Sequence, residues 1–275
     1  MEDFLRERGG PAQRASVRRV KVAGESLLLR QRENMKDSPL TSCALIFPCH
    51  NEEGAIPSVL DSALRAKEQL IQRHSLKKLE IIVVNDHSTD NSAKILESYS
   101  GKIKIVHLKG RKGYGEAIKT GIEYTTCEWI AFCDLDGTCS PSDLEFLIKK
   151  TQETSAEIIW GIRLHKKSAM PYTRRLGNLL YRWMIWVLSG KVWIADPCSG
   201  FRLFKKSVFS SVVCELPSGL HFSPALTAWC VRKKVSFSCV NISYEERIGE
   251  SKLKTLRDGV LFSWTLFSWL ILKKF

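Results

Sequence analysis

The chain has 275 residues, of which 44% are hydrophobic, enough for one domain with a substantial core. Charged residues make up 26%, an ordinary share for a globular protein, and this argues against an unfolded chain. Lysine and arginine outnumber aspartate and glutamate by 42 to 29, so the net charge is +13. This excess predicts a polyanionic partner, which would be nucleic acid, an anionic membrane or a phosphorylated substrate.

The nine cysteines show no CxxC pair, and no cysteine–histidine set has the spacing of a zinc site. Several lie in apolar runs, where a free cysteine behaves as a small hydrophobe, so we expect a reducing, cytoplasmic location. The first ten residues, MEDFLRERGG, lack the apolar segment of a signal peptide. No apolar run reaches the roughly 18 residues that a membrane-spanning helix needs.

Residues 1–40 mix charges with little periodicity, and we expect a basic, partly ordered extension. After it, short apolar runs alternate with helical patterns. Strands are predicted at residues 43–49, 79–86, 102–108, 128–134 and 157–163, and helices at 51–74, 90–99, 113–124 and 140–152. This alternation predicts an α/β domain over residues 41–255, with a Rossmann-like, mostly parallel sheet and helices on both faces. Residues 256–275 are predicted to form an aromatic, amphipathic C-terminal helix.

Three polar motifs directly follow predicted strands. They are PCHNE (48–52), NDHSTD (85–90) and DLDGT (134–138). In a parallel sheet the carboxyl ends of the strands share one rim, where ligands bind, so we expect the three motifs to converge there.

Asp134 and Asp136 are the most informative pair of side chains. On an extended chain, side chains two residues apart point the same way, about 6.5 Å apart. Two carboxylates at the end of a buried strand are costly without a cation, and oxygen ligands favour Mg²⁺ or Mn²⁺. We therefore predict that both residues bind a metal that also meets a substrate diphosphate. The alternative is an aspartate-rich turn without a ligand.

Six segments in this order resemble the family 2 glycosyltransferases of the GT-A fold, from about Cys43 to Lys252. Besides the three motifs above, which include a DxD and a VDDGSTD-like segment, they are RKGYGEAIKTG (111–121), DPCSGFRLF (196–204) and GESKL (249–253). Within the family, the sequence is most similar to dolichyl- or polyprenyl-phosphate mannose or glucose synthases. It departs from the family at Asn85, His87 and Thr138, and Glu246 stands where an arginine is common, with Arg247 next to it.

The resemblance implies an inverting, metal-dependent transfer of a hexose from GDP-mannose or UDP-glucose to a polyprenyl phosphate such as dolichyl or undecaprenyl phosphate. The donor-binding residues that it implies are Pro48, Asn51, Glu52, Asp86, Lys112, Gly113 and Asp134. The implied catalytic residues are Asp136, Asp196 and Arg202. Leu179 stands where polymer-forming synthases carry glutamine, which argues against processive synthesis.

A phosphate acceptor has a second pKa of about 6, so it is already a nucleophile at neutral pH. The protein must instead supply cations that bring two anions together. The candidate acceptor-phosphate ligands are Arg163, Arg175, Arg202, Arg247 and Lys252. Asp196 could orient the sugar or one of these arginines.

Residues 158–195 contain no acidic side chain. Within them Arg175, Asn178 and Arg182 share one helical face, and apolar residues surround it. Together with the aromatic tail, this pattern predicts helices on a membrane surface, and hence peripheral association with the cytoplasmic face of a membrane. The alternatives are an ordinary packed helix and a tail buried in the domain or in a dimer interface.

Three other functions compete with this hypothesis. Another lipid or a soluble glycan could be the acceptor, and a hydroxyl acceptor would need a base such as His165 or Asp196. The charge alone would suit a nucleic-acid-binding protein, but no nucleic-acid-binding motif is present, so no nucleic acid is expected. An inactive relative is disfavoured by the intact DLD. The sequence leaves the donor base, the donor sugar, the polyprenol length and the oligomeric state open.

Overall fold

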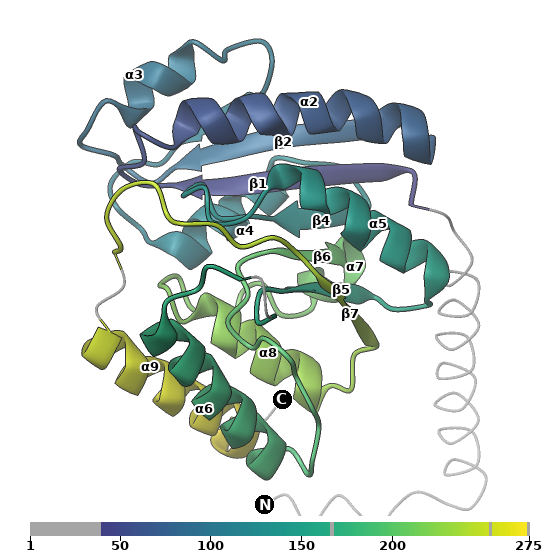
Figure 1. Ribbon diagram of the computed structural model, residues 1–275, viewed down its shortest axis with the longest axis vertical. Coiled ribbons are helices and arrows are strands. Elements are labelled where there is room, and N and C mark those ends of the chain that lie inside the picture. The colour runs from purple at the N-terminus through teal and green to yellow at the C-terminus, as the bar shows by residue number, and fades with distance from the viewer. Residues whose placement is uncertain (1–39, 166–167, 253–254, 274–275) are drawn as a thin grey trace, which may run out of the picture. The chain divides into compact units, whose positions relative to one another are not determined.

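The computed structural model describes residues 40–165, 168–252 and 255–273, with only the backbone of 255 and 256. Figure 1 shows them as a sheet with helices packed on it. Of the predicted N-terminal extension only residue 40 lies within this part. Among the described residues, no helix is long and apolar enough to cross a bilayer.

The sheet has seven strands in the order β3-β2-β1-β4-β6-β5-β7. The strands are β1 (Ser42–Cys49), β2 (Lys78–Asn85), β3 (Lys104–His107), β4 (Trp129–Phe132), β5 (Ile158–Ile162), β6 (Arg202–Lys205) and β7 (Phe237–Asn241). Neighbouring strands are parallel except β6, which runs antiparallel to both β4 and β5. The predicted mostly parallel sheet is confirmed.

Helices cover both faces of the sheet, as predicted. Along β1, Cys43, Leu45 and Phe47 join the core under α2 and α5, whereas Ala44 and Ile46 join the core under α4 and α8. The helices are α2 (Ile56–His74), α3 (Ser92–Glu97), α4 (Tyr114–Glu123), η2 (Pro141–Asp143), α5 (Leu144–Glu153), α6 (Tyr172–Leu188), α7 (Lys206–Ser210), α8 (Phe222–Arg232), α9 (Thr255–Phe267) and η3 (Ser268–Leu272). In Figure 1, α6 and α9 lie side by side below the sheet.

The elements predicted from the sequence did not include β6, β7, α7 or α8. β6 has only four residues and lies inside the segment taken as a motif. All residues of α8 from Phe222 to Val231 are buried, so the helix has no polar face and no amphipathic period. β4 ends at Phe132, earlier than predicted, so Asp134 and Asp136 lie beyond the strand on an irregular turn.

Glu80 on β2 ties three neighbouring segments together. Its carboxylate binds Lys78 Nζ at 2.8 Å and Lys104 Nζ at 2.7 Å, and it accepts a hydrogen bond from Thr125. Burial alone would raise the pKa of Glu80, but the hydrogen bonds from Lys104, Lys78 and Thr125 prevail and lower it to about 2.

We predict that Glu80→Gln lowers the free energy of unfolding by about 1 kcal/mol at pH 7, a modest loss because both lysines are partly exposed. A depressed carboxyl pKa stabilises the fold above the unfolded pKa of 4.5, and this contribution is lost as the pH falls towards 2. Urea unfolding of both proteins between pH 7 and 2.5 measures the difference. A difference that is constant over this range would contradict the assignment.

Candidate functional site

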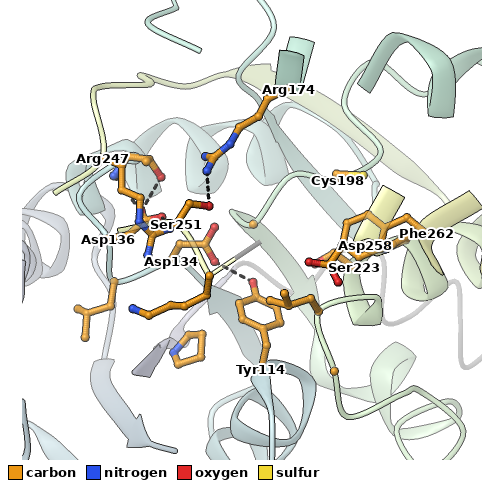
Figure 2. Close-up of a pocket in the computed structure, with 18 of the residues that line it drawn as sticks. Tyr114, Asp134, Asp136, Arg174, Cys198, Ser223, Arg247, Ser251, Asp258 and Phe262 are labelled. Carbon is orange, nitrogen blue, oxygen red and sulfur yellow. Dashed lines mark hydrogen bonds and ion pairs between the residues drawn. The ribbon is translucent and has the colours of Figure 1, made fainter. Parts of the chain in front are cut away.

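A cavity of about 440 Å³ opens at the carboxyl ends of β1, β2 and β4 and extends to α6 and α9. All three predicted motifs contribute lining residues, so they converge as expected. Its lining includes Pro48, Glu52, Asp86, Gly113, Asp134, Asp136, Arg163, Arg174, Tyr181, Arg247, Lys252 and Phe262. Figure 2 shows Asp134, Asp136 and Arg247 close together at one end, and Asp258 and Phe262 at the other.

The turn after β4 fixes the two aspartates. Asp136 Oδ1 accepts hydrogen bonds from the backbone N–H and the hydroxyl of Thr138, at 3.0 and 2.6 Å. Gly137 between them has a φ of +78°, a left-handed conformation that glycine adopts without strain. The Tyr114 hydroxyl donates to Asp134 Oδ1 at 2.9 Å. Both carboxylates therefore line the cavity in fixed orientations.

The environment of the pair favours a bound cation. Burial, and then the charge of Asp136, raise the pKa of Asp134 to about 6. Two repelling carboxylates that line one cavity suit a divalent ion. Among the described residues, no group of three or more histidine, cysteine, aspartate or glutamate side chains is placed to hold a metal. The residues fit an ion that takes Asp134 and Asp136 from the protein and its other ligands from water and substrate.

Arg247 and Lys252 bind carboxylates at this end of the cavity. The Arg247 guanidinium joins Asp136 Oδ2 and Glu52 Oε1, each at 2.7 Å, and Lys252 Nζ lies 2.5 Å from the same Glu52 oxygen. Burial raises the pKa of Glu52, although Lys252 and Arg247 oppose the shift. Both cations, predicted to bind the acceptor phosphate, therefore lie on the side of the aspartate pair and Glu52.

Asp86 anchors the loop that opens α4. Its two carboxylate oxygens accept hydrogen bonds from the backbone N–H groups of Lys112 and Gly113, at 2.6 and 2.8 Å. Gly113 has a φ of +104°, and a Cβ there would lie 2.6 Å from the Ser218 carbonyl oxygen. The backbone amides of these two predicted donor-binding residues therefore bind Asp86.

The remaining predicted donor residue, Asn51, is a loop anchor. It has a positive φ of 52°, and its side-chain oxygen accepts the backbone N–H of Thr89 at 2.8 Å. It therefore ties the PCHNE loop to the loop after β2. Neither Asn51 nor Lys112 is among the residues that line the cavity.

Arg163 is the predicted acceptor cation that is most firmly held. Its Nε and Nη2 bind the two carboxylate oxygens of Asp196 at 2.8 and 3.0 Å, and Nη2 also donates to the Cys198 carbonyl at 2.7 Å. The Asp196 side chain is fully buried and does not line the cavity. Of the two roles expected for Asp196, its contacts show the orientation of an arginine, because both carboxylate oxygens bind Arg163.

Two of the predicted phosphate ligands, Arg175 and Arg202, are not among the residues that line the cavity. Arg202 is completely buried, donates to the carbonyls of Ser199 and Pro197 at 3.0 and 2.7 Å, and lies over the Trp160 ring. Arg175 donates to the Ser168 carbonyl at 3.1 Å. Neither arginine lines the cavity, because backbone carbonyls bind their guanidinium groups. Arg202 instead shapes the turn before β6.

That turn seats Asp134. A Cβ on Gly200 would lie 2.1 Å from Asp134 Oδ2, so the carboxylate rests directly on the Gly200 backbone. The glycine of the SGFR segment is therefore required for contact with the DxD turn, which sequence alone did not reveal.

Several lining residues were missed from the sequence. Arg174 donates to the Tyr244 hydroxyl at 3.1 Å and to the Ser251 hydroxyl at 2.7 Å, and these contacts link α6 to the loop that carries Arg247. Arg174 lies in the acid-free stretch, which was the available signal. Tyr114 was present in the glycine-rich segment, whereas Asp258 and Phe262 had no polar motif around them.

We predict that Gly200→Ala displaces the Asp134 carboxylate and reduces Mn²⁺ affinity about tenfold or more, while the protein still folds. Titration of Mn²⁺ by electron paramagnetic resonance, in the presence of a nucleoside diphosphate, measures this. Gly54→Ala is the control, because a Cβ there meets only Ile248 at 3.5 Å. Unchanged Mn²⁺ affinity in Gly200→Ala would show that Mn²⁺ binding does not depend on the contact between Asp134 and the Gly200 backbone.

Comparison with known proteins identifies the family to which the chain is similar. The family model described as glycosyl transferase family 2 matches residues 44–213. The human dolichyl-phosphate beta-glucosyltransferase is 30% identical over 194 residues, 66% of this chain and 60% of that protein. A UDP-N-acetylglucosamine–dolichyl-phosphate N-acetylglucosaminyltransferase of Methanococcus voltae is 28% identical over 233 residues, 77% of this chain and 84% of that protein.

Solved structures share the fold. Glucosyl-3-phosphoglycerate synthase from Mycobacterium tuberculosis, crystallised with Mn²⁺, uridine diphosphate and phosphoglyceric acid, superposes with a TM-score of 0.65 at 18% identity, covering 85% of this chain and 80% of that one. The chain spans 60% of the human glucosyltransferase and 54% of its Dictyostelium discoideum counterpart. Since the family model matches well over half of its residues, the chain belongs to glycosyl transferase family 2, as its motifs predicted.

Proposed function

We propose that the chain is an inverting glycosyltransferase that moves a hexose from a nucleotide-sugar to a polyprenyl phosphate. The observation that carries this proposal is one cavity with two chemically different ends. Carboxylates and their cations form one end, and helices α6 and α9 form the other. The names of the human and archaeal relatives, which both act on dolichyl phosphate, support the acceptor.

The donor diphosphate would lie at the carboxylate end. Asp134 and Asp136 would hold Mg²⁺ or Mn²⁺, which neutralises the charge that develops on the departing diphosphate. Glu52, which lines the same end, would face the nucleoside, and Asp86 would hold the loop of Lys112 and Gly113 beside it. We infer a UDP-sugar, since a UDP-sugar is named for the archaeal relative, and GDP-mannose is the alternative to test.

The acceptor phosphate would meet Arg163 and Arg174. Both line the cavity, and their guanidinium groups are held by Asp196 and by Tyr244 and Ser251. Because the phosphate is already a nucleophile at neutral pH, these cations need only hold it in line with the sugar. A hydroxyl acceptor would need a base, and Asp196 is not free for that role because it is buried against Arg163.

The outer surfaces of α6 and α9 support contact with a membrane. On α6 the buried side chains include Asn178 and Tyr181, while a helical stripe of apolar residues is exposed. The exposed stripes are Leu176, Leu179, Leu180, Trp183 and Val187 on α6, and Val260, Trp264, Phe267 and Ile271 along α9 and η3. This is the reverse of a water-exposed helix, and it suits an acyl-chain interface.

We further infer that this surface lies on the cytoplasmic face of the membrane, because the nine cysteines are free thiols, which a reducing compartment maintains. The cavity reaches α6 and α9 at Tyr181 and Phe262, whose rings lie 6.0 Å apart. A polyprenyl chain in the bilayer could therefore present its phosphate to the cavity between the two helices.

Replacing Asp136 by asparagine is expected to reduce transfer at least about 100-fold, because the metal-binding charge is lost while the turn hydrogen bonds can persist. The assay follows labelled UDP-glucose, UDP-N-acetylglucosamine or GDP-mannose into an organic extract with a short polyprenyl phosphate and Mn²⁺. Chelation by EDTA should abolish the label. Glu153→Gln, at an exposed residue of α5, is the matched control. Full activity of Asp136→Asn would refute the proposal.

The double variant Trp183→Ser/Trp264→Ser should bind anionic lipid vesicles at least about tenfold more weakly, since each exposed indole loses burial worth more than about 1.5 kcal/mol. Co-sedimentation with vesicles measures this, and Phe146→Ser, at an exposed aromatic residue on α5, is the control. Unchanged vesicle binding would contradict the membrane surface. A dimer that sedimentation velocity detects only in the parent protein would assign the stripes to a subunit interface.

A further inference from the structure

Arg247 binds two carboxylates of the proposed donor site. One Nη binds Asp136 Oδ2 and the other binds Glu52, both at 2.7 Å. We propose that Arg247 competes with the divalent ion for Asp136. Arg247 leaves Asp136 only when a nucleoside diphosphate offers its guanidinium other oxygens to bind. The inference rests on the proposed donor site and adds an order of binding to it.

The argument begins with the oxygen that both cations would use. Asp136 Oδ1 is engaged by the N–H and the hydroxyl of Thr138, so Oδ2 is the oxygen turned towards other partners. A guanidinium 2.7 Å from Oδ2 and a metal bound to the same oxygen would place two positive charges in contact. Arg247 must therefore leave Asp136 when a metal arrives.

Glu52 would not be stranded by that movement. Lys252 Nζ lies 2.5 Å from Glu52 Oε1, the same oxygen that Arg247 binds. Lys252 also donates to the Asn51 carbonyl at 2.7 Å, so it stays in place independently of Arg247. The carboxylate of Glu52 keeps a cation in either state, and Asp136 exchanges one cation for another.

Arg247 also carries an unused donor. Among the described residues, its Nε is buried without a hydrogen-bond partner. A buried N–H without an acceptor is unfavourable, and a diphosphate offers several anionic oxygens. Release from Asp136 onto a diphosphate would therefore satisfy more of the guanidinium than the present arrangement does.

The backbone around Arg247 joins this exchange to the DxD turn. Glu245 N–H donates to the Thr138 carbonyl and Ile248 N–H to the Asp136 carbonyl, each at 2.9 Å. Gly249, directly after, has a φ of +83°. The guanidinium can thus change partners while the segment stays beside the aspartates, and this makes Arg247 a residue that positions the donor as well as one that excludes the metal.

The consequence is a positive coupling between metal and nucleotide. In the parent protein Mn²⁺ alone must compete with Arg247, so it binds weakly, and uridine diphosphate relieves the competition. In Arg247→Met, Mn²⁺ alone should bind about tenfold more tightly than in the parent, and the further gain on adding uridine diphosphate should shrink, within the usual range of coupling between linked sites. Arg247→Lys keeps the positive charge but has a single amino group as donor, so its affinity for Mn²⁺ alone should lie between those of the parent protein and Arg247→Met.

The experiment titrates Mn²⁺ by electron paramagnetic resonance, with and without uridine diphosphate, and needs no turnover. Arg73→Met is the control. Arg73 forms an exposed ion pair with Glu145, with a nitrogen–oxygen distance of 3.1 Å, and neither residue lines the cavity. Near-ultraviolet circular dichroism establishes whether each variant is folded. If Arg247→Met does not fold, Arg247→Lys still tests the competition.

The outcomes separate the two proposals. Tighter binding of Mn²⁺ alone in the Arg247 variants supports the competition. Equal Mn²⁺ affinity in parent and variants overturns it, and leaves the metal-dependent transferase intact if uridine diphosphate still promotes Mn²⁺ binding. If neither parent nor variants bind Mn²⁺ even with uridine diphosphate, the metal-dependent function fails, and the exchange fails with it.

Discussion

The crowding of carboxylates at the end of β4 is the constraint on which the site depends. Asp134, Asp136 and Glu52 share one small cavity, and burial already raises the pKa of Asp134 and Glu52. The surrounding chain balances this charge with hydrogen bonds and ion pairs from Tyr114, Thr138, Arg247 and Lys252, and with the nearby positive charge of Arg163. In the proposed reaction a diphosphate with its metal would replace some of these partners, and its charges would be balanced by groups that are already oriented.

The sequence predicted the parts of the fold that follow from periodicity. Apolar strands and amphipathic helices identified β1, β2, β3, β4, β5 and the helices between them, and the strand-end rule placed the motifs on one rim. β6 was missed because four residues carry too little pattern. The fully buried helix α8 was missed because a helix without a polar face has no amphipathic period.

The site was predicted less completely than the fold, because residue type does not reveal direction. Arg163 and Arg202 look alike in the sequence, yet one lines the cavity and the other lies fully buried against the carbonyls of Pro197 and Ser199. The same limit applies to Asp196, whose charge serves Arg163 rather than a substrate. Only the folded backbone decides whether a cation meets a ligand or a carbonyl group.

The antiparallel direction of β6 determines where the segment between β5 and β6 begins and ends. β5 ends, and β6 begins, at the rim that carries the aspartates, so the chain between Ile162 and Arg202 departs from that rim and returns to it. α6 therefore belongs to a closed excursion with both ends fixed beside the chemistry. Such a loop could change its length or its outer surface while the turn that carries Asp134 and Asp136 keeps its shape, so the proposed acceptor site could diversify independently of the proposed donor site.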